Sequence, residues 1–340
     1  MKISNEIKVF LGIILLLILT IVCIIIYKNI SVKEYSKNYF YMDTYINVKL
    51  YTSSEKKATN AFELVDKIYQ DYHNLTDKYN DHQFGLYELN NEGNTYIDYR
   101  LYKMIEYGYL WNNKSNGLLD ISIGNVTDIW KKYREEESGV PTIDELKKVN
   151  IGIDNILINS TKSDIEDMKI NNSIILSNGV TIDLGAISKG YVTEEVGKLL
   201  NKLGLNKFII NAGGNVLVGD YYKKGVYKIG IESPEGNGIY KIVKGNNIAV
   251  VTSGGYQRNY TYNGVTYNHI IDPNTLYPAN NMLSVTVISK SSKEADALST
   301  TLFLMSYEDG LEFIKDYDAE AIWYLNDGTI KTTEGIKNYE

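Results

Sequence analysis

The chain has 340 residues, of which 44% are hydrophobic and 23% are charged, so it can bury a large core in one large domain or two smaller ones. Its formal net charge of −7 argues against nucleic acid as a partner, because no basic surplus exists to neutralise phosphates. The single cysteine, Cys23, rules out an internal disulfide.

The most apolar stretch lies at the N-terminus. Residues 9–27 carry no charge between Lys8 and Lys28, and a helix of that length spans the hydrocarbon part of a bilayer. A cleavable signal peptide would need a shorter apolar core and a small-residue cleavage site. A lipoprotein that uses Cys23 as its lipid acceptor is disfavoured, because Val22 stands where a small residue is wanted. We therefore predict one N-terminal transmembrane helix.

This prediction divides the chain into a membrane anchor over residues 1–30, a polar linker over 31–38 and one globular domain over 39–340. Lysines flank the apolar stretch on both sides, so the charge pattern does not fix the orientation of the anchor.

Within the domain, alternating or apolar runs predict strands over 44–51, 180–184 and 207–211. Asn263-Gly264 indicates a hairpin between 258–262 and 265–272, because a tight I′ turn needs positive φ. A second hairpin is predicted at 326–328.

Helical patterns and their end signals complete the prediction. Hairpins mixed with single helices favour an α+β domain of layered sheets over a repeated βαβ array. The predicted helices cover 57–72, 99–115, 188–203, 293–306 and 307–317.

The segment from Asp183 to Tyr191 suits an anion. We expect a strand to end at Asp183, Gly185 to turn the chain and a helix to begin near Ser188, where free N–H groups and the helix dipole favour a phosphate. Lys189 in the first helical turn runs against the usual dipole preference unless an anion lies in front of it. An ordinary turn with a solvated lysine is the alternative.

Asp296 and Thr300 lie four residues apart on one face of the predicted helix 293–306. A carboxylate and a hydroxyl are hard oxygen donors, which suit Mg²⁺ better than Zn²⁺. Apolar neighbours place the pair in a partly buried setting, where an unpaired Asp would be costly. The alternative is that Asp296 caps the helix or pairs with a lysine.

His269 is one of three histidines and lies near the end of a predicted hairpin strand, before Asp272-Pro273. A histidine there suits a general base near neutral pH, whereas Asp272 suits a turn. A structural role for His269 is the alternative.

Two glycine-rich segments, 211–215 and 252–256, follow apolar runs and allow a ligand to approach the backbone closely. Neither has G-x-G-x-x-G or Walker spacing, and the chain has no G-x-S-x-G, CxxC or HExxH. These absences argue against the common nucleotide-binding folds, the usual hydrolases and zinc enzymes.

Taken in order, these segments resemble the ApbE family of FAD:protein FMN transferases, from about Tyr41 to near the C-terminus. The remaining matching blocks are Met42-Asp43-Thr44 and residues 117–124. The resemblance implies a T-fold-like α+β domain that binds FAD, with Mg²⁺ at its pyrophosphate.

Site residues follow from the same resemblance, position by position. It implies Asp296 and Thr300 as side-chain metal ligands, with the carbonyls of Ala186 and Ser299, and His269 as the base that deprotonates the acceptor hydroxyl. Residues expected to line the flavin nucleotide are Met42, Tyr79, Leu118, Leu119, Asp120, Asp183, Lys189 and Ile270.

The implied reaction transfers FMN from FAD to a Ser or Thr hydroxyl of another protein and releases AMP. Mg²⁺-dependent FAD hydrolysis and non-catalytic flavin binding are the alternatives. Asp43, Ser122, Asn125 and Gly255 depart from the family pattern in binding loops, which puts FAD affinity and acceptor fit in question. We expect a membrane electron-transfer subunit as acceptor and the catalytic domain on the extracytoplasmic side of the cell membrane.

Overall fold

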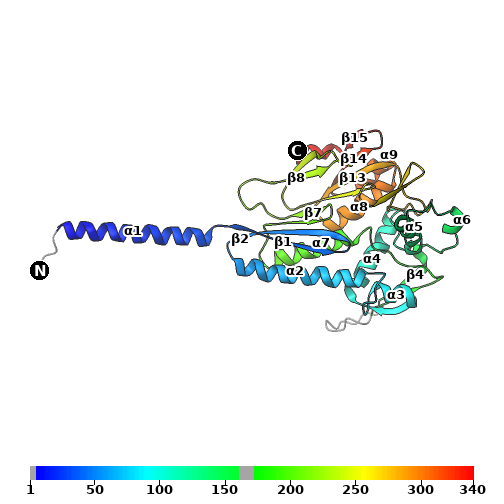
Figure 1. Ribbon diagram of the computed structural model, residues 1–340, viewed down its shortest axis with the longest axis horizontal. Coiled ribbons are helices and arrows are strands. Elements are labelled where there is room, and N and C mark those ends of the chain that lie inside the picture. Colours follow the sequence, from blue (N-terminus) through cyan, green and yellow to red (C-terminus); the bar gives the residue numbers. More distant parts are fainter. Residues whose placement is uncertain (1–4, 161–171) are drawn as a thin grey trace.

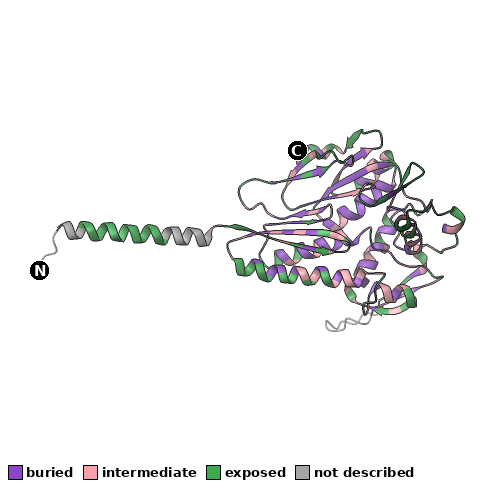
Figure 2. Cartoon of the chain, in the orientation of Figure 1, coloured by how far each residue is buried: buried purple, intermediate pink, exposed green. Residues whose placement is uncertain are grey.

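The computed structural model describes the backbone of residues 5–160 and 172–340, with the side chains at 5–8, 23–30, 160 and 172 outside that description. Helix α1 (Asn5–Ile30) extends away from the rest of the chain, and its described side chains are exposed (Figures 1 and 2). Among the described residues, no helix combines the length and apolarity needed to cross a membrane. The predicted transmembrane helix is therefore not confirmed, and the side chain of Cys23, the alternative lipid acceptor, lies outside the described residues.

The domain is built on an eight-stranded antiparallel sheet in the order β1-β2-β6-β7-β10-β13-β14-β15. Tight turns join β1 to β2, β6 to β7 and β14 to β15, whereas longer segments with elements of their own connect the other neighbouring strands. The strands are β1 (Lys33–Tyr41), β2 (Thr44–Thr52), β6 (Phe208–Ala212), β7 (Asn215–Val218), β10 (Ile248–Gly254), β13 (Met282–Ser289), β14 (Ala319–Leu325) and β15 (Ile330–Thr332).

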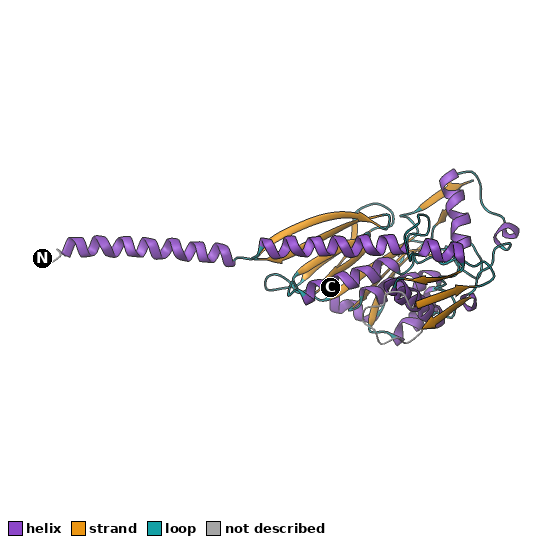
Figure 3. Ribbon diagram, turned by 90° about the horizontal axis from the view of Figure 1, so that it is seen from below, coloured by secondary structure: helices purple, strands orange, loops and turns teal. Residues whose placement is uncertain are grey.

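Both faces of this sheet are buried. Helices α2 (Glu55–Thr76), α7 (Ser188–Lys202) and α8 (Ser292–Leu304) pack on one face, and α2 lies alongside the β1–β2 hairpin (Figures 1 and 3). The ribbon β8 (Tyr227–Glu232) and β9 (Ile239–Gly245) and the 3₁₀ helix η3 (Glu334–Tyr339) contribute to the core on the other face. Strand β10 shows the period of two that this requires: Ala249 and Val251 join the helical core, and Ile248 and Val250 the other.

The remaining elements form a smaller lobe beside the sheet. A three-stranded sheet and the hairpin β11–β12 belong to it, and a separate apolar cluster around Trp130 joins α5 to that hairpin. The elements of this lobe are α3 (Leu86–Glu92), β3 (Asn94–Ile97), α4 (Tyr99–Lys114), α5 (Gly124–Glu136), α6 (Ile143–Leu146), η1 (Ile153–Asn155), β4 (Ile156–Ser160), β5 (Asn172–Leu176), β11 (Asn259–Tyr262) and β12 (Val265–Asn268). Helix α9 (Tyr307–Phe313) and η2 (Ile314–Asp316) instead pack against the main core, where η2 contacts β14.

Most of the predicted elements are confirmed, with one error. The hairpin at Asn263-Gly264 has φ of 49° and 79° at these two residues, as a I′ turn requires. The predicted strand over 180–184 is wrong: the segment forms a parallel bridge between Thr181 and Ile123, with two backbone hydrogen bonds, from Asp183 N–H to the Ile121 carbonyl and from Gly124 N–H to the Thr181 carbonyl. Its partner is a loop rather than a strand, so no ladder can extend.

Candidate active site

The start of α7 presents an unpaired cation. The helix begins at Ser188 with no acidic residue in its first turn, and Lys189 is half-buried. Among the described residues, none forms a hydrogen bond or ion pair with Lys189. Its charge acts on both His269 and Asp296, lowering the pKa of each. Lys189 is therefore close enough to the predicted base and to the predicted metal ligand for its charge to act on both, and an anion there would satisfy it.

Three of the four predicted metal ligands, Asp296, Ser299 and Thr300, lie on α8. Asp296 is only 3% exposed, and among the described residues its carboxylate has a single donor, the N–H of Gly190, at 2.6 Å from Oδ2. Burial raises the pKa of Asp296, which Lys189 and the Gly190 N–H oppose. A buried carboxylate with so few donors is a poor anion by itself, and a cation would stabilise its charged form.

Ser253 at the end of β10 contacts two of the residues on α8, although it was not among the predicted site residues. Its hydroxyl lies 2.8 Å from Ser299 Oγ and 3.3 Å from Thr300 Oγ1. Its place in the glycine-rich segment 252–256 was the only available signal. The resulting set of one carboxylate and three hydroxyls consists of hard oxygen donors, which fit Mg²⁺.

We refer to Asp296, Ser299, Thr300, Ser253 and Lys189 as the α8 corner. Within the described part of the chain, no group of three or more His, Cys, Asp or Glu side chains could hold a metal. Any cation here would consequently depend on hydroxyls, backbone carbonyls and the substrate's own oxygens. Ala186, the predicted carbonyl ligand, is half-buried two residues before α7.

Gly190 allows α7 to approach α8. A Cβ at this position would lie 2.3 Å from Asp296 Cβ and 2.6 Å from the Ser292 carbonyl oxygen, closer than any side chain tolerates. The lack of a side chain is what lets the Gly190 N–H reach the Asp296 carboxylate.

His269 lies one residue beyond the end of β12, half-buried. Its Nδ1 is 3.2 Å from the carbonyl oxygen of Arg258, which only an N–H can satisfy, so Nδ1 carries the proton and Nε2 keeps a lone pair. Burial, together with the charges of Lys189 and Arg258, lowers the pKa of His269 to about 4. The ring is thus neutral at pH 7 and in the tautomer of a base.

The β1–β2 turn at Met42-Asp43 is linked to the segment beside His269. Both residues have positive φ, 51° and 54°, which is strained for residues other than glycine. Two contacts hold the turn: the Met42 N–H donates to His73 Nδ1 at 3.3 Å, and Arg258 donates to the Asp43 carbonyl at 2.8 Å. Arg258 therefore links two predicted site residues: its side chain holds the turn that contains Met42, and its backbone carbonyl contacts the ring of His269.

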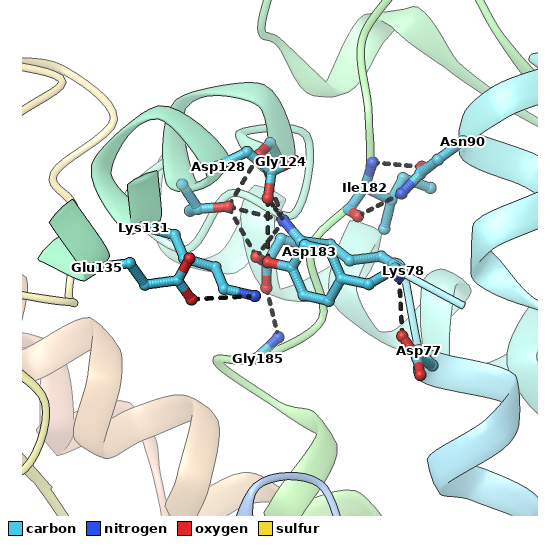
Figure 4. Close-up of polar contacts among 12 residues, drawn as sticks. Asp77, Lys78, Asn90, Gly124, Asp128, Lys131, Glu135, Ile182, Asp183 and Gly185 are labelled. Carbon is cyan, nitrogen blue, oxygen red and sulfur yellow. Dashed lines mark hydrogen bonds and ion pairs between the residues drawn. The ribbon is translucent and has the colours of Figure 1, made fainter. Parts of the chain in front are cut away.

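Asp183 is held by a buried network rather than left open. Its carboxylate accepts from Lys78 Nζ at 2.9 Å, Thr127 Oγ1 at 2.7 Å and the Gly185 N–H at 2.8 Å (Figure 4). Burial would raise the pKa of Asp183, but Lys78 and these hydrogen bonds lower it to about 2. The sequence analysis did not identify Lys78, because no local motif marks it.

Other predicted flavin contacts are distributed around this network. Tyr79 follows Lys78 and its ring is 50% exposed. Burial raises the pKa of Asp120, which accepts from the Ser122 N–H at 2.8 Å. Leu118 and Ile270 border the main core. Leu119 is buried, at 1% exposed, its N–H donates to Ser115 and its carbonyl accepts from Asn112, and its place beside the flavin stays a prediction.

Comparison with known proteins is consistent with this geometry. The sequence profile described as the ApbE family matches residues 42–323. A Treponema pallidum protein named FAD:protein FMN transferase is 26% identical over 90% of this chain and 88% of its own length. A Vibrio cholerae protein of the same name is 30% identical over 67% of this chain and 66% of its own length.

Solved structures match the whole domain. The crystal structure of the Thermotoga maritima ApbE protein superposes with a TM-score of 0.81 and 26% identity, covering 91% of this chain and 99% of that one. The flavin transferase ApbE from Vibrio cholerae superposes with a TM-score of 0.75 at 21% identity, covering 91% and 100%, and supports the fold alone. The mixed α+β fold with antiparallel sheets is thereby confirmed.

Proposed function

Because this chain belongs to the ApbE family, we propose that it acts as an FAD:protein FMN transferase, moving the FMN half of FAD to a Ser or Thr hydroxyl of an acceptor protein and releasing AMP. The observation that carries the proposal is Lys189, which forms no hydrogen bond or ion pair with the described residues and whose charge acts on both a neutral histidine and a buried carboxylate. A pyrophosphate near the predicted base and metal ligand is an anion that would pair with Lys189.

The α8 corner would hold Mg²⁺ through Asp296 and Thr300, with the carbonyls of Ala186 and Ser299. The ion would supply charge neutralisation at the pyrophosphate and at the leaving phosphate of AMP. Lys189 and the positive end of the α7 dipole would favour the same phosphates, whereas the N–H groups of Ser188, Gly190 and Tyr191 already donate to acceptors within the protein. Ser253 keeps the hydroxyls of Ser299 and Thr300 turned toward this point.

His269 would act as the base. Its Nε2 takes the proton from the acceptor hydroxyl, whose oxygen forms a bond to the FMN phosphorus. The bond from that phosphorus to the bridging oxygen breaks, and AMP leaves with the electron pair. The contact from Nδ1 to the Arg258 carbonyl keeps the ring in the required tautomer and stabilises the imidazolium that forms.

The flavin half would lie toward Tyr79, Asp120 and Asp183, with Met42 and Ile270 bordering it. Tyr79 offers an exposed aromatic face for stacking. Asp120, half-buried with a raised pKa, offers a group that can exchange hydrogen bonds with a heteroaromatic ring.

Membrane association forms part of the proposal. Residues 9–27 are uncharged, and α1 extends away from the domain (Figure 1). An anchored enzyme with its catalytic domain on the extracytoplasmic side would share a surface with a membrane electron-transfer subunit as its acceptor.

The test uses the full chain with FAD, an acceptor protein that carries a flavinylation sequence, and either Mg²⁺ or EDTA. Intact mass of the acceptor and release of AMP are measured together. An FMN-sized gain in mass that needs Mg²⁺ is the expected result. FMN and AMP released in the presence of acceptor, with no gain in its mass, would make the protein an FAD pyrophosphatase. Tight FAD binding without either product would make it a binding protein.

A further inference from the structure

Lys78 lies in the loop between α2 and α3, and its side chain is only 7% exposed. Its ammonium contacts Asp128 Oδ1 at 2.8 Å, Asp183 Oδ2 at 2.9 Å, Thr127 Oγ1 at 3.0 Å and the Gly124 carbonyl at 3.3 Å. Burial by itself would lower the pKa of Lys78, but the two carboxylates outweigh it and raise the pKa above its usual value. Lys78 therefore stays charged with its hydrogen-bonding capacity filled.

These contacts join three segments that are far apart in sequence. Lys78 comes from the loop after α2, Gly124, Thr127 and Asp128 from the first turns of α5, and Asp183 from the turn before α7 (Figure 4). Asp183 uses its other oxygen, Oδ1, to accept from the Gly185 N–H. The position of Lys78 thus determines how the chain enters α7, where Lys189 begins the phosphate site.

Tyr79 is fixed by the same network. Its N–H donates to Asp77 Oδ1 at 2.8 Å, and its hydroxyl donates to Asp128 Oδ1, the atom that also pairs with Lys78. The ammonium of Lys131 lies 3.4 Å from the ring centroid and covers one face. Tyr79 is therefore held at its backbone and at its hydroxyl, with Lys78 Nζ also 5.4 Å from the ring centroid, while the residue as a whole stays 50% exposed to a ligand.

From this geometry we infer that Lys78 is a positioning residue for FAD: it sets the orientation of Tyr79 and the turn at Asp183 relative to each other without contacting the substrate. The inference rests on the proposed function, since it assigns these two residues to the flavin half of FAD. A network kept only for stability could be replaced by apolar packing, because a buried ion pair is weak support for a fold. This network instead connects Tyr79 and Asp183, the two residues that the proposed function assigns to the flavin half of FAD.

The experiment compares four full-length variants with the wild type. Lys78→Met removes the ammonium and keeps most of the side-chain volume. Thr127→Val removes one hydroxyl from the network without leaving an unpaired charge. Lys78→Arg retains the positive charge. Arg100→Met is the matched control, because Arg100 joins Asp71 on α2 to Asp98 at the start of α4 without contacting a predicted ligand residue.

Each variant is measured for FAD dissociation constant by quenching of flavin fluorescence, for KM and kcat in AMP release, and for Tm. We expect Lys78→Met to raise Kd and KM for FAD about tenfold or more, with a smaller change in kcat at saturating FAD. Thr127→Val should raise both by about threefold, the value of one hydrogen bond. Lys78→Arg should recover part of the lost affinity, and Arg100→Met should lower Tm with Kd unchanged.

Equal Kd values for Lys78→Met and Arg100→Met at reduced Tm would overturn the inference and leave Lys78 a purely structural residue. Should Lys78→Met fail to fold, Thr127→Val decides: an unchanged Kd and KM overturn the inference, and a rise in both supports it. A wild-type protein that binds no FAD and releases no AMP would overturn the proposed function itself, and the inference with it.

Discussion

Lys78 and Lys189 lie on two sides of the same turn and have opposite environments. Lys78 is buried, and its ammonium has four oxygen contacts, two of them carboxylates. Lys189 is half-buried and has no partner among the described residues. Asp183 and Asp296 repeat the contrast: the first is fully paired with a pKa lowered to about 2, and the second has one donor and a raised pKa.

The contrast separates residues that hold the site from residues that await a ligand. A saturated ion pair stabilises a conformation but has little capacity left for binding. A charge without a partner destabilises the free protein and gains most when its ligand arrives, as perturbed groups at functional sites commonly do.

The sharpest test substitutes the two aspartates in parallel. Asp296→Asn should reduce Mg²⁺-dependent AMP release by roughly 10³-fold or more, because a ligand to the ion is lost. It should leave Tm unchanged or raise it, since burial already opposes the ionised form. Asp183→Asn should instead lower Tm, because breaking a buried pair costs about 3–5 kcal/mol. A fall in Tm for Asp296→Asn of the same size as for Asp183→Asn, measured by calorimetry without metal, would refute the contrast.

His269→Ala should lower kcat by about 10²–10⁴-fold, the range for a general base, and leave the Kd for FAD unchanged. The pKa of His269 is lowered to about 4, so the neutral base persists above that pH. The pH profile of kcat/KM should be flat between pH 6 and 8 and fall only as pH drops through about 4. An acidic limb near pH 6.5 that disappears in the variant would contradict the assigned environment.

The same histidine has a consequence for stability. Its folded pKa lies below its unfolded value of about 6.5, so the unfolded chain binds the proton first as pH falls. His269 should therefore destabilise the fold progressively between pH 6.5 and 4, and His269→Ala should reduce this part of the acid sensitivity. Denaturant unfolding of both proteins across this range measures it.

Lys189→Met should weaken FAD binding by about ten- to a hundredfold, consistent with the loss of a charged phosphate contact. Because Lys189 forms no hydrogen bond or ion pair with the described residues, Tm should change less than in Lys78→Met. Removal of the charge should also raise the pKa of His269 and move the acidic limb of the rate profile upward. An unchanged acidic limb in Lys189→Met would show that the charge of Lys189 does not influence the pKa of His269.

The smallest effect concerns the strained turn. Asp43 has φ of 54°, so Asp43→Gly should stabilise the fold by about 0.5–1 kcal/mol in urea unfolding. Asn47→Gly, in the middle of β2, is the control and should destabilise. Stabilisation by both substitutions would show that the turn is not the cause.

Local rules were sufficient for much of the fold. Asn263-Gly264 predicted its hairpin from turn chemistry alone, and α7 and α8 followed from helical periodicity. The failure at 180–184 has a long-range cause, because its pairing partner is the loop at 121–123. Sequence alone did not show that this segment lacks a strand on either side.

The candidate site divides in the same way. The pairing of Asp296 with Thr300 was predictable because residues four apart on one helix share a face. Lys78 was not, since its partners Thr127 and Asp183 lie 49 and 105 residues away. Asp183 was placed correctly at the turn before α7, but its pairing with Lys78 depends on tertiary structure.

Strand β1 separates the end of α1 from the turn at Met42. It begins three residues after α1 ends and runs nine residues to the turn at Met42, which Arg258 links to the backbone beside His269. At about 3.3 Å per residue this strand is roughly 30 Å long. Under the proposal that a membrane surface holds α1, the acceptor hydroxyl would reach His269 at about that distance from the surface, and an acceptor tethered there would need a stalk of comparable length.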